Sequence, residues 1–312
     1  MRTDEHVAPP APATRSWLPQ WGLLAVLWGS SFLFMKVALQ TLVPLQIAFG
    51  RVALGALFLL AVTALGRMRL PTDRRTWLDV GVVAVFQHTI PFTLFAWGET
   101  RISSVLAGIW NATTPLFAVL FGLAILPWEK VGRDKLIGLA VGFFGVLVVL
   151  GFWNVSAGGD VLGSLACVGA TACYGIAVPY TRRRLTPRGL PVVPVITAQL
   201  LSASVQLGIV TLLFTSAPTS WPFNVTASML GLGILGTGLA FILNYRIVRD
   251  AGTLAATSVT YVIPIVSTVL GVLVLGETLT WNEPVGAVIV LAGVALVQGM
   301  THLNVRRSRA PA

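Results

Sequence analysis

Long apolar segments separated by short polar connections run from about residue 20 to residue 300. Ten of these segments approach 20 residues, the length that an α-helix needs to cross the hydrocarbon core of a bilayer. They lie at 20–39, 44–65, 78–97, 103–126, 134–151, 160–180, 191–214, 226–246, 253–275 and 283–300. The pattern therefore predicts an all-α integral membrane protein with ten transmembrane helices.

The two halves of the sequence share a phrase that starts near a proline and ends with a glutamate. The first copy is TPLFAVLFGLAILPWE at 114–129, and the second is PIVSTVLGVLVLGE at 264–277. An offset of 148 or 149 residues aligns Pro115 with Pro264, Gly122 with Gly271, Glu129 with Glu277, Gly138 with Gly286 and Gly145 with Gly293. Each half holds five spans, and because five is an odd number the second half crosses the membrane in the opposite direction. Such an inverted repeat is typical of secondary transporters, whose substrate site lies between the halves.

Four regions are expected along the chain. A polar N-terminal tail at 1–19 is predicted to be disordered and cytoplasmic. The first repeat covers 20–151 with spans 1–5, the second covers 160–300 with spans 6–10, and a basic cytoplasmic tail occupies 301–312. No small-residue cleavage site follows the first apolar segment, which argues against a signal peptide.

Composition and charge support this reading. The chain is 55% hydrophobic and 10% charged, whereas a soluble domain carries about 25% charged residues. With a cytoplasmic N-terminus and ten spans, all 21 Lys and Arg residues except Lys36, Arg51 and Arg101 fall on the inner side. The positive-inside rule predicts this distribution. The net charge of +10 therefore reflects topology in the plasma (inner) membrane, with both termini cytoplasmic, and it does not indicate a nucleic-acid partner.

Three sequence features resemble the EamA-type transporters of the drug/metabolite transporter (DMT) superfamily. They are WGSSF at 28–32, the paired proline-to-glutamate phrases, and GETLTWNEPVGAVIVLAGVAL at 276–296. The resemblance covers residues 20 to about 300. It implies two EamA repeats, ten spans, cytoplasmic termini and export of small metabolites, with amino acids as a frequent substrate class.

Polar residues within spans are the candidate substrate-binding residues, because a polar group in lipid is costly and usually faces a cavity or a partner. His88 lies near the middle of the third span, and Asn111 lies in the fourth. We expect a neutral His88 ring and Asn111 to hydrogen-bond a zwitterionic substrate; a histidine that bridges two helices is the alternative. Four amphipathic aromatic residues could line the same pocket or pack elsewhere: Trp28, Trp110, Tyr174 and Tyr261.

A second group of residues is expected to shape or gate the pathway. Pro115 and Pro264 are predicted to form paired kinks beside a central cavity. Lys36 and Arg51 lie near the outer ends of spans one and two, and the favoured interpretation is that both snorkel toward the membrane surface. In the alternative, one of them pairs with Glu99 to close an outer gate. Glu129 and Glu277 are expected at span ends, where they terminate helices.

Small residues form matching stripes on spans four and nine. The stripes are Gly108, Asn111, Pro115, Ala118 and Gly122, and Thr257, Thr260, Pro264, Ser267 and Gly271. Such stripes leave room for a ligand or for a closely packed helix, and both alternatives stay open. The GLAVG motif at 138–142 is expected to pack against another helix of the same chain in preference to forming a dimer face.

Three classes of function are compatible with a membrane protein of this composition. The leading class is a secondary transporter that exports small metabolites, amino acids first, by alternating access. A proton-coupled drug or cation antiporter would need a carboxylate near mid-membrane, and none of the acidic residues falls there. An intramembrane enzyme would need a polar catalytic cluster, and the sequence has none. We therefore expect no enzymatic activity, no cofactor and no metal, with a small-molecule substrate and the lipid bilayer as partners of a monomer or homodimer.

Overall fold

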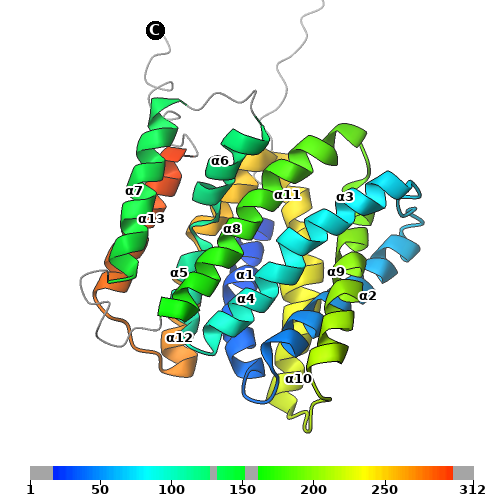
Figure 1. The fold of residues 1–312 in the computed structure, drawn as a ribbon, viewed down its shortest axis with the longest axis horizontal. Coiled ribbons are helices and arrows are strands. Elements are labelled where there is room, and N and C mark those ends of the chain that lie inside the picture. Colours follow the sequence, from blue (N-terminus) through cyan, green and yellow to red (C-terminus); the bar gives the residue numbers. More distant parts are fainter. Residues whose placement is uncertain (1–16, 127–131, 152–160, 298–312) are drawn as a thin grey trace, which may run out of the picture.

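The computed structural model describes residues 17–126, 132–151 and 161–297. Within these residues all regular secondary structure is helical (Figure 1). The tails at the two ends of the chain, the connection at 152–160 and Glu129 lie outside the described residues.

The first half of the chain forms seven α-helices and one π-helix. They are α1 (Leu18–Ala38), α2 (Pro44–Leu65), α3 (Arg74–Ala84), the π-helix η1 (Val85–Thr89), α4 (Ile90–Glu99), α5 (Ser104–Asn111), α6 (Thr114–Ile125) and α7 (Arg133–Val149). Helices α3, η1 and α4 join end to end into one span, and α5 and α6 together form the next span.

The second half follows the same plan with more irregular turns. It contains α8 (Val161–Arg184), the short 3₁₀ helix η3 (Thr186–Arg188), α9 (Val192–Phe214), α10 (Phe223–Leu230), the π-helix η4 (Gly231–Leu239), α11 (Ala240–Thr257), the 3₁₀ helix η5 (Ser258–Tyr261), α12 (Ile263–Leu275) and α13 (Asn282–Val297).

Eight helical segments of the described residues are long and apolar enough to cross a membrane. They are Leu18–Ala38, Pro44–Leu65, Arg74–Glu99, Ser104–Ile125, Val161–Arg188, Val192–Phe214, Phe223–Gly252 and Ala255–Leu275. The protein is therefore a multi-pass membrane protein. Helices α7 and α13 stand where the fifth and tenth spans are expected, but they have only 17 and 16 described residues.

The third span of each half contains a π-helix where the sequence predicts a regular span. In the first half, Pro91 follows η1 by two residues; a proline lacks the N–H of an α-helical bond and its ring crowds the carbonyl four residues earlier, so a wider turn relieves the conflict. In the second half, η4 reads GLGILGTGL, and four glycines offer little side-chain packing to hold the tighter α-turn.

Pro115 and Pro264 each lie in the first turn of a helix that follows a break. Pro115 begins α6 after the turn that ends α5, and Pro264 begins α12 after η5. A proline is tolerated in a first turn because its missing N–H would have no intrahelical partner there. Each break thus lies just before its proline and divides the span into two helical pieces.

Helices α7 and α13 pack against each other at one edge of the molecule (Figure 1). A Cβ atom added to Gly293 would lie 2.4 Å from the Gly142 nitrogen and 2.7 Å from the Gly138 carbonyl oxygen. A Cβ atom on Gly145 would lie 3.0 Å from the Gly286 carbonyl oxygen. The expectation that the GLAVG motif packs within the chain is therefore confirmed, since only glycine permits this approach.

Candidate functional site

A cavity of about 760 Å³ lies between the two halves of the chain. Helices of the first half that contribute to its walls include α1, α2, α4 and α5, and those of the second half include α8, α9, η4, α11 and α12. This volume is within the range of small-molecule sites. The cavity is therefore the candidate substrate site.

Aromatic rings form much of the cavity wall. The ring-bearing residues are Trp28, Phe32, Phe92, Phe95, Tyr174 and Phe241. They support one another edge to face: the ring centroids of Trp28 and Phe241 are 6.4 Å apart, and those of Phe32 and Phe95 are 5.6 Å apart. Such contacts limit ring motion and give an apolar ligand a preformed surface.

Neutral polar side chains interrupt this aromatic surface. They include Ser31, Gln87, Asn111, Thr114, Gln199 and Asn244. The side-chain amides of Gln87, Asn111 and Asn244 make no hydrogen bond with a described residue. Because an amide can both donate and accept, these groups are available to a polar ligand of either hydrogen-bonding character.

Arg51 supplies a positive charge to the cavity wall. Its side chain is buried, and its Nε donates to Thr237 Oγ1 at 2.9 Å while Nη2 approaches the Gly236 carbonyl oxygen at 3.5 Å. The guanidinium carbon lies 3.9 Å from the centre of the Phe92 ring, a cation–π contact. Among the described residues that line the cavity, no Asp or Glu is present.

One end of the cavity reaches the connection between α8 and α9. Thr181, Arg182, Thr186 and Gly189 belong to its wall there. The charge distribution of the sequence predicts this side of the membrane to be cytoplasmic, and we call it the inner end.

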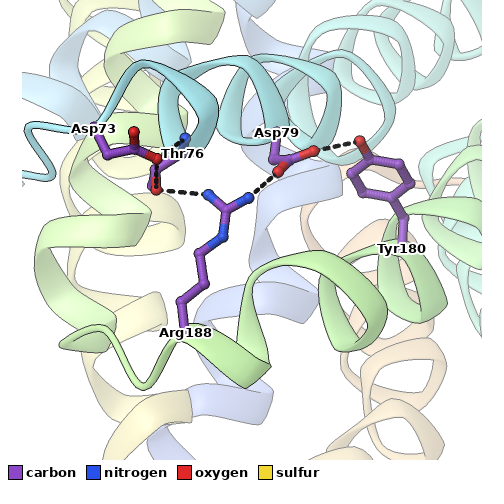
Figure 2. A network of polar contacts seen from close by, with 5 residues as sticks. All are labelled: Asp73, Thr76, Asp79, Tyr180 and Arg188. Atoms are coloured by element: carbon purple, nitrogen blue, oxygen red, sulfur yellow. Dashed lines mark hydrogen bonds and ion pairs between the residues drawn. The ribbon is translucent and has the colours of Figure 1, made fainter.

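A network of polar contacts joins α3 to the α8–η3 segment at the inner end (Figure 2). Arg188 donates to Asp79 and to Thr76, and the Tyr180 hydroxyl donates to the second Asp79 oxygen at 2.7 Å. Asp73 caps α3 by accepting from the Thr76 backbone N–H at 2.9 Å, and this bond lowers the pKa of the Asp73 carboxyl below its ordinary value. These bonds hold α3 against the α8–η3 segment on one side of the inner end.

At the opposite, outer end, charged side chains bond to backbone groups of neighbouring helices. The Glu277 carboxylate accepts from the Ser104 and Val105 backbone N–H groups at 2.8 and 3.0 Å and from the Ser104 hydroxyl at 2.9 Å. Lys36 donates to the carbonyl oxygens of Glu99 and Ile102 at 2.6 and 2.8 Å. A carboxylate at a helix N-terminus and an ammonium at a helix C-terminus both match the helix dipole.

The structure separates the predicted substrate-binding residues into two groups. Trp28, Asn111 and Tyr174 line the cavity, whereas His88, Trp110 and Tyr261 do not. His88 is fully buried behind the wall, edge to face with the rings of the wall residues Phe92 and Phe241. Neither its ring nitrogens nor the Trp110 indole N–H has a hydrogen-bond partner among the described residues. In this conformation His88 therefore packs behind the aromatic wall and does not line the cavity.

The predicted gating residues also differ from their expected roles. The interpretation that Arg51 snorkels toward the membrane surface is wrong, because its guanidinium is buried between Phe92 and η4 and lines the cavity. Lys36 bonds the Glu99 backbone carbonyl and not its carboxylate. Both carboxylate oxygens of Glu99 are buried with no hydrogen-bond partner among the described residues. The pairs proposed for an outer gate, Lys36 or Arg51 with Glu99, are thus not formed in this conformation.

Each stripe of small residues serves both of the uses that its sequence leaves open. Near the break in each span, Asn111 of the first stripe and Thr257 and Thr260 of the second line the cavity. Further along, a Cβ atom added to Gly108 would lie 2.6 Å from the Ser267 Cβ. The stripes therefore pack against each other at one level and open around the cavity at another.

Gln87, Gln199 and Asn244 are cavity residues that the sequence interpretation missed. Their polarity within apolar spans was an available signal. Gln199 carried a second signal, because it stands 148 residues after Arg51, at the offset that relates the two halves.

Several known proteins are similar to this chain over nearly its whole length. The profile of the EamA-like transporter family matches residues 18–151 and again residues 161–298. Uncharacterized transporter YoaV of Bacillus subtilis (strain 168) is 22% identical over 277 residues, covering 88% of this chain and 94% of YoaV. Uncharacterized inner membrane transporter YedA of Escherichia coli (strain K12) is 25% identical over 292 residues, covering 91% of this chain and 92% of YedA.

A crystal structure of another protein has the same fold. It superimposes with a TM-score of 0.64 at 21% sequence identity, over 95% of this chain and 99% of that chain.

Proposed function

The chain belongs to the EamA-like transporter family, and from that membership we propose that it is a secondary transporter that exports small metabolites by alternating access, with amino acids as the leading substrate class. The observation that carries this proposal is the cavity of about 760 Å³ between the two halves, which reaches one end of the membrane core and is closed at the other. A site of this kind, presented to one side at a time, is the basis of alternating access.

We further propose ten spans in two inverted repeats, and the α7–α13 contact supports this arrangement. Gly145 approaches Gly286, and Gly138 approaches Gly293. The repeat offset of 148 residues converts the first pair into the second with its partners exchanged. Two antiparallel helices related by a two-fold axis show such an exchange of contact partners. When that axis lies in the membrane plane, the two repeats have inverted topology.

A second pair of contacts follows the same relation. A Cβ atom on Gly29 of α1 would lie 2.5 Å from the Val266 Cβ on α12. A Cβ atom on Gly175 of α8 would lie 2.5 Å from the Phe117 Cβ on α6. Since α1 and α8 begin the two repeats and Val266 stands 149 residues after Phe117, each repeat packs its first helix against the fourth span of the other.

We assign a transport state to this conformation from the side of the membrane to which the cavity opens. The cavity wall includes residues of the α8–α9 connection, which the charge pattern predicts to be cytoplasmic. Ser104 and Val105 at the outer end are at most 1% exposed. We therefore assign an inward-open state, in which an exporter would load substrate from the cytoplasm.

The absence of an acidic group from the described cavity wall favours uniport over proton coupling. A proton-coupled antiporter uses a membrane-embedded carboxylate as its carrier. Glu99 is the acidic residue to test for that alternative, because it is fully buried at the outer end.

Transport by purified protein in liposomes tests the proposal. We expect uptake of labelled amino acids down their gradients and no accumulation when only a pH gradient is imposed. Asn244→Trp, which fills the cavity, should reduce uptake at least about tenfold, whereas Leu273→Trp on the exposed face of α12 should leave it unchanged.

Two results would contradict this proposal. Accumulation against a substrate gradient, driven by a proton gradient alone, would exclude uniport. Uptake restricted to cationic dyes would favour the drug or cation antiporter over the amino-acid exporter.

A further inference from the structure

We propose that Arg51 is the anion-binding residue of the central cavity and that the substrate carries a carboxylate group attached to an apolar body. This inference names the substrate class of the proposed transport site and rests on that proposed function. It is carried by the bonding, burial and surroundings of the Arg51 side chain.

Only part of the Arg51 guanidinium is used within the protein. Nε and Nη2 each point to the π-helix η4, where they meet Thr237 and Gly236. Nη1 makes no hydrogen bond with a described residue, although the side chain is only 8% exposed and lines the cavity. The free edge of the fork, formed by Nη1 and the remaining Nη2 hydrogen, is the edge that binds a carboxylate with two parallel bonds.

Neighbouring groups hold the guanidinium in this orientation. The Thr237 hydroxyl donates its proton to the Leu232 carbonyl oxygen at 2.8 Å, so its lone pairs face Arg51 Nε. The guanidinium carbon also lies over the Phe92 ring. Because these contacts hold one edge of the guanidinium, the other edge is preorganised for a ligand.

Among the described residues, no carboxylate forms an ion pair with Arg51, and none lines the cavity. Glu99 interacts with Arg51 through space only, without a direct contact. A buried cation without a counter-ion is costly, and an anionic ligand removes that cost. The same unpaired charge repels organic cations, which gives the site selectivity by exclusion as well as by attraction.

The two repeats differ in charge at the position of Arg51. Gln199 stands 148 residues after Arg51, and it also lines the cavity. Gly236, which Arg51 approaches, likewise stands 148 residues after the buried His88. Equivalent positions thus carry a cation in one half and a neutral amide in the other. A ligand with one carboxylate and an apolar body fits the aromatic part of the cavity around Arg51, since the other cation of the described wall, Arg182, lies at the inner end.

Binding to the purified full-length protein tests the inference without depending on transport. Thermal stabilisation would be measured with four compounds that share one apolar body: leucine, 4-methylpentanoate, leucinamide and 3-methylbutylamine. The first two carry a carboxylate and the last two do not. We expect leucine and 4-methylpentanoate to bind at least about tenfold more tightly than the other two. Sulfate, tested in parallel, should stabilise less than 4-methylpentanoate.

Variants of Arg51 then test whether this residue is the source of the selectivity for carboxylates. Arg51→Gln, which copies the residue at the equivalent position, should weaken carboxylate binding at least about tenfold and should not weaken leucinamide binding. Arg51→Lys keeps the charge without the fork and should recover only part of the loss. Arg69→Gln is the matched control, because Arg69 is exposed in the connection after α2, and it should bind like the wild type.

The outcomes separate this inference from the proposed transport function. Equal or tighter binding of leucinamide or 3-methylbutylamine, no binding of either carboxylate, or equal stabilisation by sulfate would overturn the role of Arg51, even if the variants fail to fold. Selective carboxylate binding without uptake of any compound into liposomes would support the anion site while contradicting export of these substrates.

Discussion

At the outer end of the cavity, Glu277 and Lys36 bond to backbone groups at the ends of α5 and α4, whereas at the inner end Arg188 and Asp79 bond to each other. The backbone groups held by Glu277 belong to residues that are at most 1% exposed. The side chains of Arg188 and Asp79 are 28% and 15% exposed.

This difference identifies the end whose bonds control the conformation. The Glu277 and Lys36 side chains are partly buried, and their charge-assisted hydrogen bonds to backbone groups contribute about 1.5–3 kcal/mol each. An ion pair that water reaches contributes about 0–1 kcal/mol. We therefore expect that opening the outer end requires breaking stronger bonds, and that the inner network stabilises one wall with less effect on the balance between the proposed states.

The largest effect is expected from Glu277→Gln. Loss of the charge weakens the cap on α5, so the outer end should open more often. A cysteine at Val105, in a background without Cys167 and Cys173, should react with a membrane-impermeant thiol reagent from outside at least about tenfold faster than with Glu277 present. Glu283→Gln is the control, because Glu283 bonds locally to the Thr280 backbone. Equal labelling rates in the two variants would mean that the cap does not hold the outer end closed.

A smaller effect is expected at the inner end. Arg188→Met removes the contacts to Asp79 and Thr76 shown in Figure 2. Because the pair is partly exposed, the rate of liposome transport should change by no more than about threefold. Arg184→Met removes a neighbouring exposed charge and serves as the control. A tenfold loss confined to Arg188→Met would show that the inner network controls the conformation as strongly as the outer cap does.

The smallest effect is expected from Asp73, at the start of α3. The backbone N–H of Thr76 is the main cause of the lowered pKa of Asp73, which lies below its ordinary value of 3.8. A carboxyl whose pKa is lowered by folding adds stability above that ordinary value, and the stability is lost as the pH falls through the folded-state pKa.

Melting temperatures measured against pH check this expectation. The Asp73→Ser variant keeps a capping oxygen without a titrating group, so its difference from the wild type should be constant near neutral pH and change only below about pH 4. Parallel curves over the whole range would show that the Asp73 bond does not contribute to stability.

Several features of the fold were predictable because they depend on short stretches of sequence. A segment crosses a membrane if it is long and apolar, whatever its neighbours are. The eight long segments of the structure each overlap a predicted span. Kinks were predicted at Pro115 and Pro264, and the structure has a break just before each of them, since a proline acts on the backbone immediately before it.

The site was less predictable, because facing a cavity is a property of the assembled helices. Trp28, Asn111 and Tyr174 lie on the cavity wall, but His88 was expected there on the same grounds of polarity and depth and is covered by Phe92 and Phe241. Gln87 and Gln199 are also polar residues within spans and line the cavity, but the sequence interpretation did not include them.

What the sequence determined by itself was the membrane class, the family and the duplication, because composition, motifs and internal repeats are all properties of the chain before it folds. Only the tertiary structure decided the direction of the Arg51 side chain. Its position near a span end favoured snorkelling, yet η4 and Phe92 from other spans supply the contacts that turn the guanidinium inward. The direction of a side chain in a membrane protein depends on which helix packs over it, and a π-turn such as η4 shifts the helix faces in a way that regular periodicity does not reveal.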